Sequence, residues 1–216
     1  MPVEHYDRVL YPLQDKVIGF FKATPFYLTG GTALSRGYYN HRYSDDLDYF
    51  INDHPDFVRV AERQIAKLSA AFHDIHIALR GDNFVRLFVS AERMKIEMVN
   101  DVPAHIGGLI DHSLLGVIDS RENILANKIT ALVDRGMPKD VADIYVLLKD
   151  DLSIRKALMD ADSKAAGISP LLIAKIFAEF NYSLLDTEIK WITPVPSQMI
   201  RDYLMVISQK IVQGRV

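Results

Sequence analysis

The first hundred residues alternate between the hydrophobic spacing of helices and that of strands. Apolar side chains recur every three or four positions in residues 4–22 and 55–72, which predicts two amphipathic helices. Apolar runs typical of strands occupy 25–31, 46–52, 74–81, 84–92 and 94–101. A short helix is predicted at 32–40, and the Gly-Asp-Asn at 81–83 predicts a hairpin turn. This order predicts a small mixed β-sheet with helices packed on it.

From about residue 120 onward the spacing is helical almost throughout. The predicted helices are 120–135, 140–150, 153–165, 169–181 and 196–213. Breaks at Gly136, Pro138, Gly167 and the Thr-Pro-Val-Pro of 193–196 separate them. The predicted fold class is therefore α+β: a small mixed-sheet core with packed helices at residues 1–117, followed by a C-terminal helical bundle at residues 118–216.

Aspartates crowd the start of the predicted strand 46–52, as the sequence DDLDYFIN of residues 45–52 shows. Strands usually avoid aspartate. Because strand side chains alternate faces, Asp46 and Asp48 point to one side, and Leu47 and Tyr49 point to the other. Neighbouring carboxylates repel each other unless a cation lies between them, and Mg²⁺ prefers carboxylate oxygens together with substrate phosphates. The pair predicts a site for a divalent metal ion.

A Gly-Gly-Thr turn precedes this acidic strand. Gly30 and Gly31 allow the backbone to come close to a ligand and to direct N–H groups toward it, and Thr32 adds a hydroxyl at the start of a helix. Either motif alone is more often an ordinary turn or a solvated loop. Turn, helix and acidic strand in close succession instead predict phosphates held beside a metal ion, which describes a nucleoside triphosphate (NTP) site.

A third carboxylate is expected if two metal ions take part in the reaction. Glu97 is the candidate, because it alternates with Ile96 and Met98 on a strand whose other face is apolar. It would bind metal or remove the proton of an acceptor hydroxyl. The alternatives are that Glu97 is an exposed strand residue, or that Asp101 takes this role.

Three cations lie on the first predicted helix after residue 120, and two aspartates lie on the next one. Arg121, Lys128 and Arg135 stand seven residues apart, so they share one line that falls within the apolar stripe. Asp140 and Asp143 lie on the next helix, with Asp143 on its apolar side. Buried cations need anions. The sequence allows an internal ion-pair network, contact of Lys128 and Arg135 with a triphosphate, or both. Asp134 is angled toward solvent.

Two more polar residues precede the acidic pair. The histidines are spread along the chain without a regular spacing. Arg42 and Ser44 are candidate phosphate contacts, with Arg42 alternatively bracing Asp45 or Asp46. None of the histidines shows metal-ligand spacing, so they are interpreted as structural or surface residues.

Cysteine content, the length of apolar runs and net charge exclude some classes of site and of protein. The 216 residues include no cysteine, which excludes a thiolate zinc site and a thiol nucleophile. No apolar run reaches the length of a membrane-spanning helix, and no signal sequence is recognisable, so we expect a cytoplasmic protein that does not enter a membrane. The net charge of −3 argues mildly against tight nonspecific binding of RNA.

In the motifs GGTAL, HRYSDDLDYF, KIEMV and LANKITALVDRGMPKDVADIYVLL, the sequence resembles the AbiEii/AbiGii toxin family of nucleotidyltransferases, in the DNA polymerase β-like superfamily. The resemblance covers roughly residues 25–150. It implies that Asp46, Asp48 and Glu97 bind metal and that Gly30, Gly31 and Thr32 form the phosphate-binding turn. The family's later motifs fall on Lys128, Asp134-Arg135 and Lys139-Asp140 with Asp143. Thr32 stands where the superfamily has serine, and Glu97 stands where many relatives have aspartate.

The resemblance implies a Mg²⁺-dependent nucleotidyltransferase core with a two-metal site and an NTP substrate. The helical domain would contribute to the same active-site cleft, with Lys128 as a catalytic cation. The acceptor would be the 3′ end of tRNA or a protein hydroxyl, and a cognate antitoxin is an expected partner. Alternatives are a nucleotide-binding or interaction module without turnover and, less favoured, a metal-dependent glycosyltransferase, which also uses an Asp-x-Asp pair.

Overall fold

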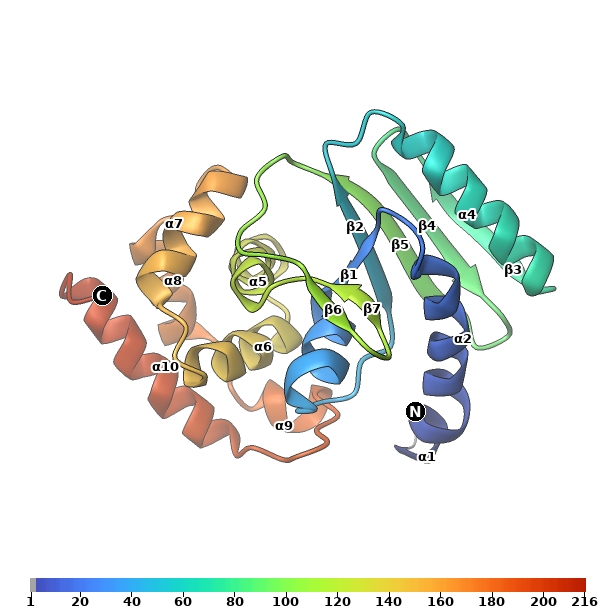
Figure 1. The fold of residues 1–216 in the computed structure, drawn as a ribbon. Coiled ribbons are helices and arrows are strands. Elements are labelled where there is room, and N and C mark those ends of the chain that lie inside the picture. The colour runs from blue at the N-terminus through green and yellow to red at the C-terminus, as the bar shows by residue number, and fades with distance from the viewer. Residues whose placement is uncertain (1–2) are drawn as a thin grey trace. The chain divides into compact units, whose positions relative to one another are not determined.

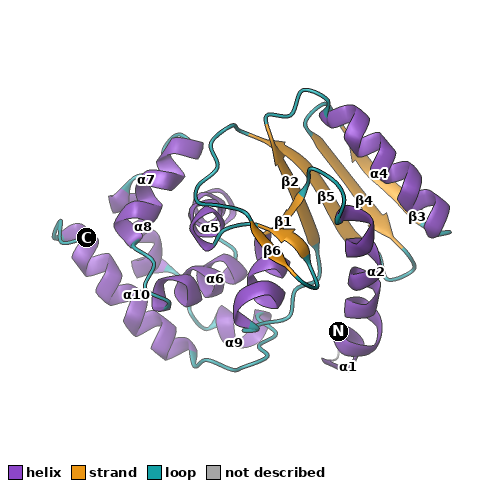
Figure 2. Cartoon of the chain, viewed as in Figure 1, coloured by secondary structure: helices purple, strands orange, loops and turns teal. Residues whose placement is uncertain are grey.

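The computed structural model describes residues 3–216, and the chain divides into two compact units. The first contains the residues up to Tyr38 together with Ser44–Asp119, and the second contains Tyr39–Tyr43 and Ser120–Val216. All named strands belong to the first unit, whereas the second is built of helices (Figure 2). The chain passes from the first unit to the second between Asp119 and Ser120. The predicted domain boundary between residues 117 and 118 stays a prediction.

A mixed sheet forms the first unit, and among the described residues it has seven strands in the order β3-β4-β5-β2-β1-β7-β6 (Figure 1). They are β1 (Tyr27–Thr29), β2 (Leu47–Asn52), β3 (Ile75–Arg80), β4 (Phe84–Val89), β5 (Met94–Asp101), β6 (Ile110–His112) and β7 (Gly116–Ile118). β2 lies between β1, which is antiparallel to it, and β5, which is parallel to it. The predicted hairpin at 81–83 is confirmed, because β3 and β4 pair antiparallel across it. β6 and β7 were not predicted, since three residues are too few for an alternating pattern to show.

The apolar face of the sheet is covered by two helices, α2 (Tyr11–Phe21) and α4 (Phe57–Ala71) (Figure 1). Leu47, Tyr49 and Ile51 of β2 point to this side and are buried. The ring of Tyr49 stacks on Phe21 of α2 at 3.6 Å between centroids. Burial of such aromatic and aliphatic area supplies the main driving force for this layer. The opposite face of β2 is consequently left for polar side chains.

The other predicted helices of the first unit are present but wound in an unexpected way. The N-terminal helix comprises α1 (Val3–His5), the π-helical η1 (Tyr6–Leu10) and α2, and the helix after the glycines comprises α3 (Gly30–Thr32) and the π-helical η2 (Ala33–Tyr39). Hydrophobic spacing does not distinguish a π-helical segment of this length from an α-helical one. Such segments are frequent at functional sites.

The second unit contains the five helices predicted and a short one that was not. Their bounds are α5 (Arg121–Arg135), α6 (Pro138–Lys149), α7 (Ile154–Lys164), α8 (Pro170–Glu179), α9 (Leu184–Glu188) and α10 (Ser197–Val212). The Ser120 hydroxyl caps α5 by accepting from the Asn123 N–H, and Gly136, with φ +59°, ends it. Within the unit, α5 packs against α6 and α7, and α8 packs against α10. The unpredicted α9 has only five residues.

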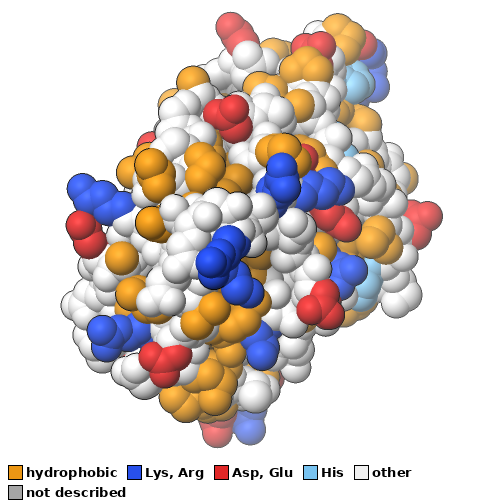
Figure 3. Space-filling model, turned by 90° about the vertical axis from the view of Figure 1, so that its left-hand side faces the viewer, with side chains coloured by type: hydrophobic (Ala, Val, Ile, Leu, Met, Phe, Trp, Pro, Cys, Tyr) orange, Lys and Arg blue, Asp and Glu red, His pale blue; other side chains and the backbone are white. Residues whose placement is uncertain are grey.

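The surface of the helical unit carries exposed apolar side chains and a cavity. Hydrophobic patches lie beside lysine and arginine side chains in Figure 3. Residues of α7, α8 and α10 and the end of the chain line a cavity of about 440 Å³; the lining residues are Arg155, Leu158, Met159, Asp162, Ile168, Pro170, Ile211, Gly214 and Val216. None of the predicted site residues is among them. Across residues 3–216, no helix combines the length and apolar character needed to cross a lipid bilayer.

Candidate functional site

The acidic residues of the predicted site lie on the polar face of β2 and β5. Leu47, Tyr49, Ile96 and Met98 are at most 1% exposed, whereas Asp48 and Glu97 alternate with them and are partly exposed. Asp48 pairs with Glu97 in the parallel register of the two strands. Residues paired in this way direct their side chains to the same side of the sheet. The predicted placement of Asp48 and of Glu97, each opposite the apolar side of its own strand, is therefore confirmed, while their functional roles remain predictions.

Gly30 brings the backbone turn directly against one of these carboxylates. It has φ +69°, a conformation that non-glycine residues rarely adopt. A Cβ built on Gly30 would collide with the Oδ2 atom of Asp48. Glycine is thus required here for two independent reasons, and the start of α3 and the acidic strand are held in close contact.

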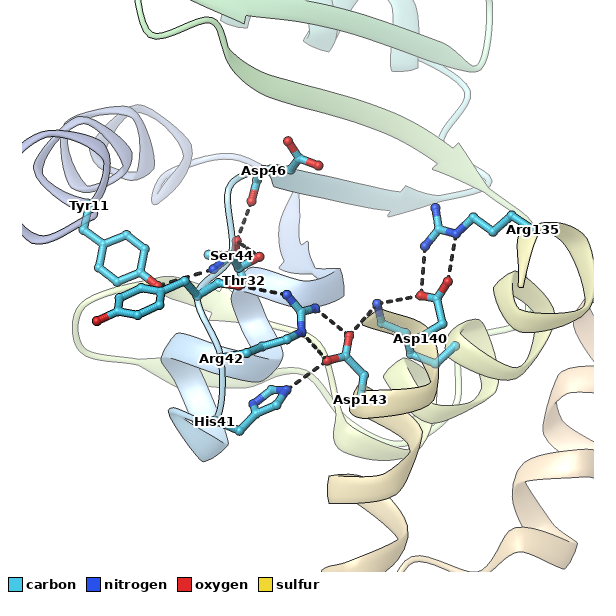
Figure 4. Close-up of polar contacts among 11 residues, drawn as sticks. Tyr11, Thr32, His41, Arg42, Ser44, Asp46, Arg135, Asp140 and Asp143 are labelled. Atoms are coloured by element: carbon cyan, nitrogen blue, oxygen red, sulfur yellow. Dashed lines mark hydrogen bonds and ion pairs between the residues drawn. The ribbon is translucent and has the colours of Figure 1, made fainter. Parts of the chain in front are cut away.

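The segment that leads into the acids is fixed by buried hydrogen bonds (Figure 4). The Thr32 hydroxyl, 1% exposed, is bonded to the Asp46 carbonyl and lies 2.9 Å from the Ser44 hydroxyl. The side-chain amide of Gln14 donates to the carbonyls of Ser44 and Asp45 at 3.0 and 3.1 Å. Thr32 and Ser44 therefore hold the backbone on which Asp46 stands. Their predicted contact with phosphate stays a prediction.

Two cations that sequence reasoning missed accompany the acids. The Lys95 ammonium lies 3.1 Å from Asp46 Oδ2 and 3.3 Å from Glu97 Oε1, and Arg86 reaches Glu97 Oε1 at 2.6 Å. Burial works to lower the pKa of Lys95, but Asp48, Asp46 and Glu97 outweigh it and raise that pKa. Burial likewise works to raise the pKa of Glu97, yet Lys95 and Arg86 bring a net lowering. Both groups are therefore charged at neutral pH.

The donor atoms on this face suit a hard cation that is completed by phosphate. Mg²⁺ is commonly held by one or two carboxylates together with substrate phosphates. Asp46 and Asp48, two positions apart on β2 and its approach, offer that set. Within the described part of the chain, no group of three or more histidine, aspartate or glutamate side chains is arranged to hold a metal ion. Asp46 and Asp48 are therefore the candidate ligands for a metal ion that substrate phosphate completes, whereas Glu97 has two cations beside it.

A second polar cluster lies within the helical unit, around two carboxylates that are fully buried (Figure 4). Asp143 of α6 accepts from Arg42 Nε and Nη2, both at 2.7 Å, and contacts His41 Nε2 at 2.9 Å. The Lys128 ammonium lies 2.7 Å from Asp143 and 3.1 Å from Asp140. Arg135 donates to both oxygens of Asp140 at 2.9 Å.

The ion-pair network proposed for these helices is therefore confirmed. Burial would raise the pKa of Asp143, but Arg42 and Lys128 hold it well below its usual range. The pKa of Asp140 is likewise lowered, against the effect of burial, by Arg135 and Lys128. Contact of Lys128, Arg135 and Arg42 with phosphate stays a prediction, because an ion pair with aspartate does not decide it.

Several charged residues lie outside the acidic face and the buried network. Asp134 is exposed, as expected. Arg121 pairs with Asp150. His41 is buried and structural, consistent with the interpretation of the histidines.

His105 contacts Asp119 at 3.0 Å, and Asp119 is a fully buried carboxylate that also accepts from Thr29. Sequence spacing had not singled out Asp119.

Comparison with known proteins adds the family to this geometry. Residues 13–193 match the family described as "Nucleotidyl transferase AbiEii toxin, Type IV TA system". No curated protein matches the chain. Among solved structures, similar folds are found in a protein of Helicobacter pylori described as "putative nucleotidyltransferase" (TM-score 0.65, 19% identity, covering 100% of this chain and 97% of that one) and in JHP933 of the same species (TM-score 0.63, 17% identity, covering 100% and 94%).

MenT4, a nucleotidyltransferase toxin of Mycobacterium tuberculosis, is also similar, with a TM-score of 0.61, 14% identity and coverage of 98% of this chain and 86% of that one. At these identities the likeness shows the fold, which confirms the predicted fold class. The family match covers most of the chain and includes both the acidic strand and the helices of the buried network. The chain belongs to the AbiEii family of nucleotidyl transferase toxins.

Proposed function

We propose that this protein is a Mg²⁺-dependent nucleotidyltransferase that moves a nucleotide from an NTP onto an acceptor hydroxyl and acts as a toxin. The observation that carries the proposal is the placement of Asp48 on the polar face of β2, directly against the positive-φ turn at Gly30. This brings a potential metal ligand within contact of a backbone turn that has the geometry to approach phosphate. The family match supports the reaction class.

The proposed reaction is an in-line displacement at the α-phosphorus of the NTP. The acceptor oxygen forms a bond to the α-phosphorus while the bond from that phosphorus to the bridging oxygen breaks, and pyrophosphate leaves with that bond's electron pair. The proton of the acceptor hydroxyl passes to Glu97, if that residue is the base, or otherwise to solvent water. A bound divalent ion would neutralise charge on the phosphates. Asp46 and Asp48 would hold it, and the Gly30-Gly31 turn would receive the β and γ phosphates.

Glu97 is the predicted third carboxylate, either as a metal ligand or as the base for the acceptor proton. Its lowered pKa disfavours the role of base, because a weaker base takes up a proton less readily. A second metal ion at Glu97 would have to lie beside Arg86 and Lys95. The roles of Lys128, Arg135 and Arg42 toward phosphate are supported by charge, since three cations surround two carboxylates there.

The acceptor is proposed to be tRNA, with a protein hydroxyl as the alternative and a cognate antitoxin as a further partner. An experiment that separates them is incubation with each α-³²P-labelled NTP and either total RNA or a protein extract. We expect label in the RNA fraction and none in Asp48→Asn. Asp82→Asn, which changes an exposed aspartate in the 81–83 turn, is the matched control and should retain full transfer. Full transfer by Asp48→Asn would refute the metal role.

A nucleotide-binding module without turnover is the second candidate, and the two cations on Glu97 are the observation in its favour. Calorimetric titration with NTP and Mg²⁺ would then show binding, while no pyrophosphate would be released with either acceptor class. Release of pyrophosphate that depends on Asp48 excludes this candidate.

A further inference from the structure

Lys95 stands where a second metal ion would be expected. Its ammonium lies within 3.3 Å of carboxylate oxygens from two different strand regions, Asp46 before β2 and Glu97 on β5. In a two-metal site the ions lie roughly 3.5–4 Å apart and share flanking carboxylates. The carboxylates of Asp46 and Glu97 are the pair that such a second ion would have to bridge in this protein.

The position of Lys95 is set by the sheet and is not an accident of a flexible side chain. Asp48 pairs with Glu97, and Leu47 pairs with Ile96, so the step before β2 brings Asp46 beside Lys95. Lys95 and Glu97 are two residues apart on one strand and therefore share a face. The Lys95 side chain is only 24% exposed. The register thus places Lys95 beside these two acids, and its ammonium contacts both.

Arg86 strengthens the argument from the neighbouring strand. It pairs with Glu97 across β4 and β5, and its Nε and Nη2 atoms both approach Glu97 Oε1, at 2.7 and 2.6 Å. Glu97 therefore has two cations on the same oxygen. A divalent ion bound there would be repelled by both of them. Asp48, in contrast, faces the Gly30 turn, where phosphate is proposed to bind.

We propose that the Lys95 ammonium is a built-in second cation of the acidic face, which shares the Asp46 carboxylate with a single divalent ion held by Asp46 and Asp48, so that the site binds one divalent ion in place of two. This inference rests on the proposed function only for Asp46 and Asp48 as ligands. Glu97 then acts as a positioning residue that holds Lys95, with Arg86 fixing Glu97 in turn. The protein would supply with its own chain part of the positive charge that a second metal ion would otherwise bring.

The test is a count of bound Mn²⁺ per chain, measured by electron paramagnetic resonance on the 216-residue chain with Mn²⁺ and a non-hydrolysable NTP analogue as the probes, and with Mn²⁺ and the analogue without protein as the blank. We expect one ion for the wild type and for Lys95→Arg, which keeps the charge. We expect two for Lys95→Met, which removes it, and one again for the double variant Lys95→Met with Glu97→Gln. Lys67→Met, an exposed lysine on α4, is the matched control and should bind one.

Each other result decides against the proposal. Two ions in the wild type, or one ion in Lys95→Met, would overturn the role of Lys95 while leaving the metal role of Asp46 and Asp48 intact, provided that Asp48→Asn abolishes binding. No bound Mn²⁺ in any variant would overturn both that metal role and this inference. Lys95→Gln provides the same count if Lys95→Met does not fold, which circular dichroism would reveal.

Discussion

The acidic face of the sheet and the buried network of the helices use the same kinds of charge in opposite proportions. On the sheet, three carboxylates (Asp46, Asp48 and Glu97) are accompanied by two cations, Lys95 and Arg86. In the helical unit, two carboxylates, Asp140 and Asp143, are surrounded by Arg42, Lys128, Arg135 and His41.

Burial differs as well. Asp140 and Asp143 are fully buried, whereas the Asp46 side chain is 28% exposed. A buried carboxylate without its partners is costly, whereas a partly solvated one is not. The comparison indicates that the buried network maintains the fold, while the sheet keeps surplus negative charge within reach of solvent, where it can accept a ligand.

The largest expected effect comes from removing the central carboxylate of the buried network. Asp143→Asn leaves Arg42 and Lys128 without their shared anion, and we expect it to lower the free energy of unfolding by about 3–5 kcal/mol. Urea denaturation followed by circular dichroism measures the change. Asp134→Asn, on the exposed face of α5, is the matched control and should remain within about 0.5 kcal/mol of the wild type. Equal stability of the two variants would contradict the structural role of the network.

A smaller effect is expected where the turn meets the acidic strand. Gly30→Ala forces a non-glycine residue into positive φ and places a Cβ against Asp48. We expect a loss of about 1–3 kcal/mol in unfolding free energy, together with loss of nucleotide transfer. Gly19→Ala in α2 is the control, because it has open space around its Cα and should stabilise the helix by about 0.5–1 kcal/mol. A Gly30→Ala protein with normal transfer would mean that the close contact is dispensable.

The stability that the buried network gives the fold is expected to depend on pH. The pKa of Asp143 and that of Asp140 are lower in the folded protein than in the unfolded chain, so the unfolded state binds more protons as the medium becomes acidic. The contribution of these two aspartates to the free energy of unfolding is complete above about pH 5. It is lost progressively as the pH falls through and below about 4. Urea titrations from neutral to acidic pH should show a shallower decline for Asp143→Asn than for the wild type. Parallel declines would contradict the assignment.

The smallest change in stability is expected on the acidic face itself. Asp46→Asn removes one partner of Lys95 but also relieves repulsion between neighbouring carboxylates, so we expect a change of about 0–1 kcal/mol in unfolding free energy. Nucleotide transfer should nevertheless be lost. A large loss of stability in this variant would remove the distinction between the two regions.

Much of the fold follows from local patterns. The alternation around Asp48 and around Glu97 predicted that each points away from the apolar face of its strand. The spacing of Lys128 and Asp143 on their helices allowed an inward-facing ion pair as one of the alternatives. Periodicity cannot reveal contacts that depend on tertiary pairing. Arg42 meets a carboxylate 101 residues away, and nothing in its neighbourhood indicates that partner.

Lys95 was missed for a related reason. Its contact with Asp46 follows from the parallel register of β2 and β5, which no hairpin in the sequence specifies. Arg86 could have been found, because the hairpin between β4 and β5 places it opposite Glu97. The three-residue strands β6 and β7 lie below the length at which alternation is detectable.

The grouping of Tyr39–Tyr43 with the helices has a consequence for how this protein can be divided. The polypeptide leaves the first unit after Tyr38, returns to it at Ser44, and leaves it again after Asp119. A fragment that starts at Ser120 would lack His41 and Arg42, and the buried Asp143 would keep Lys128 but lose these two partners. The second unit is therefore built from two separate segments of the chain. A truncated protein, or a chimera that exchanges the C-terminal part between homologues, would contain an intact second unit only if residues 39–43 were included.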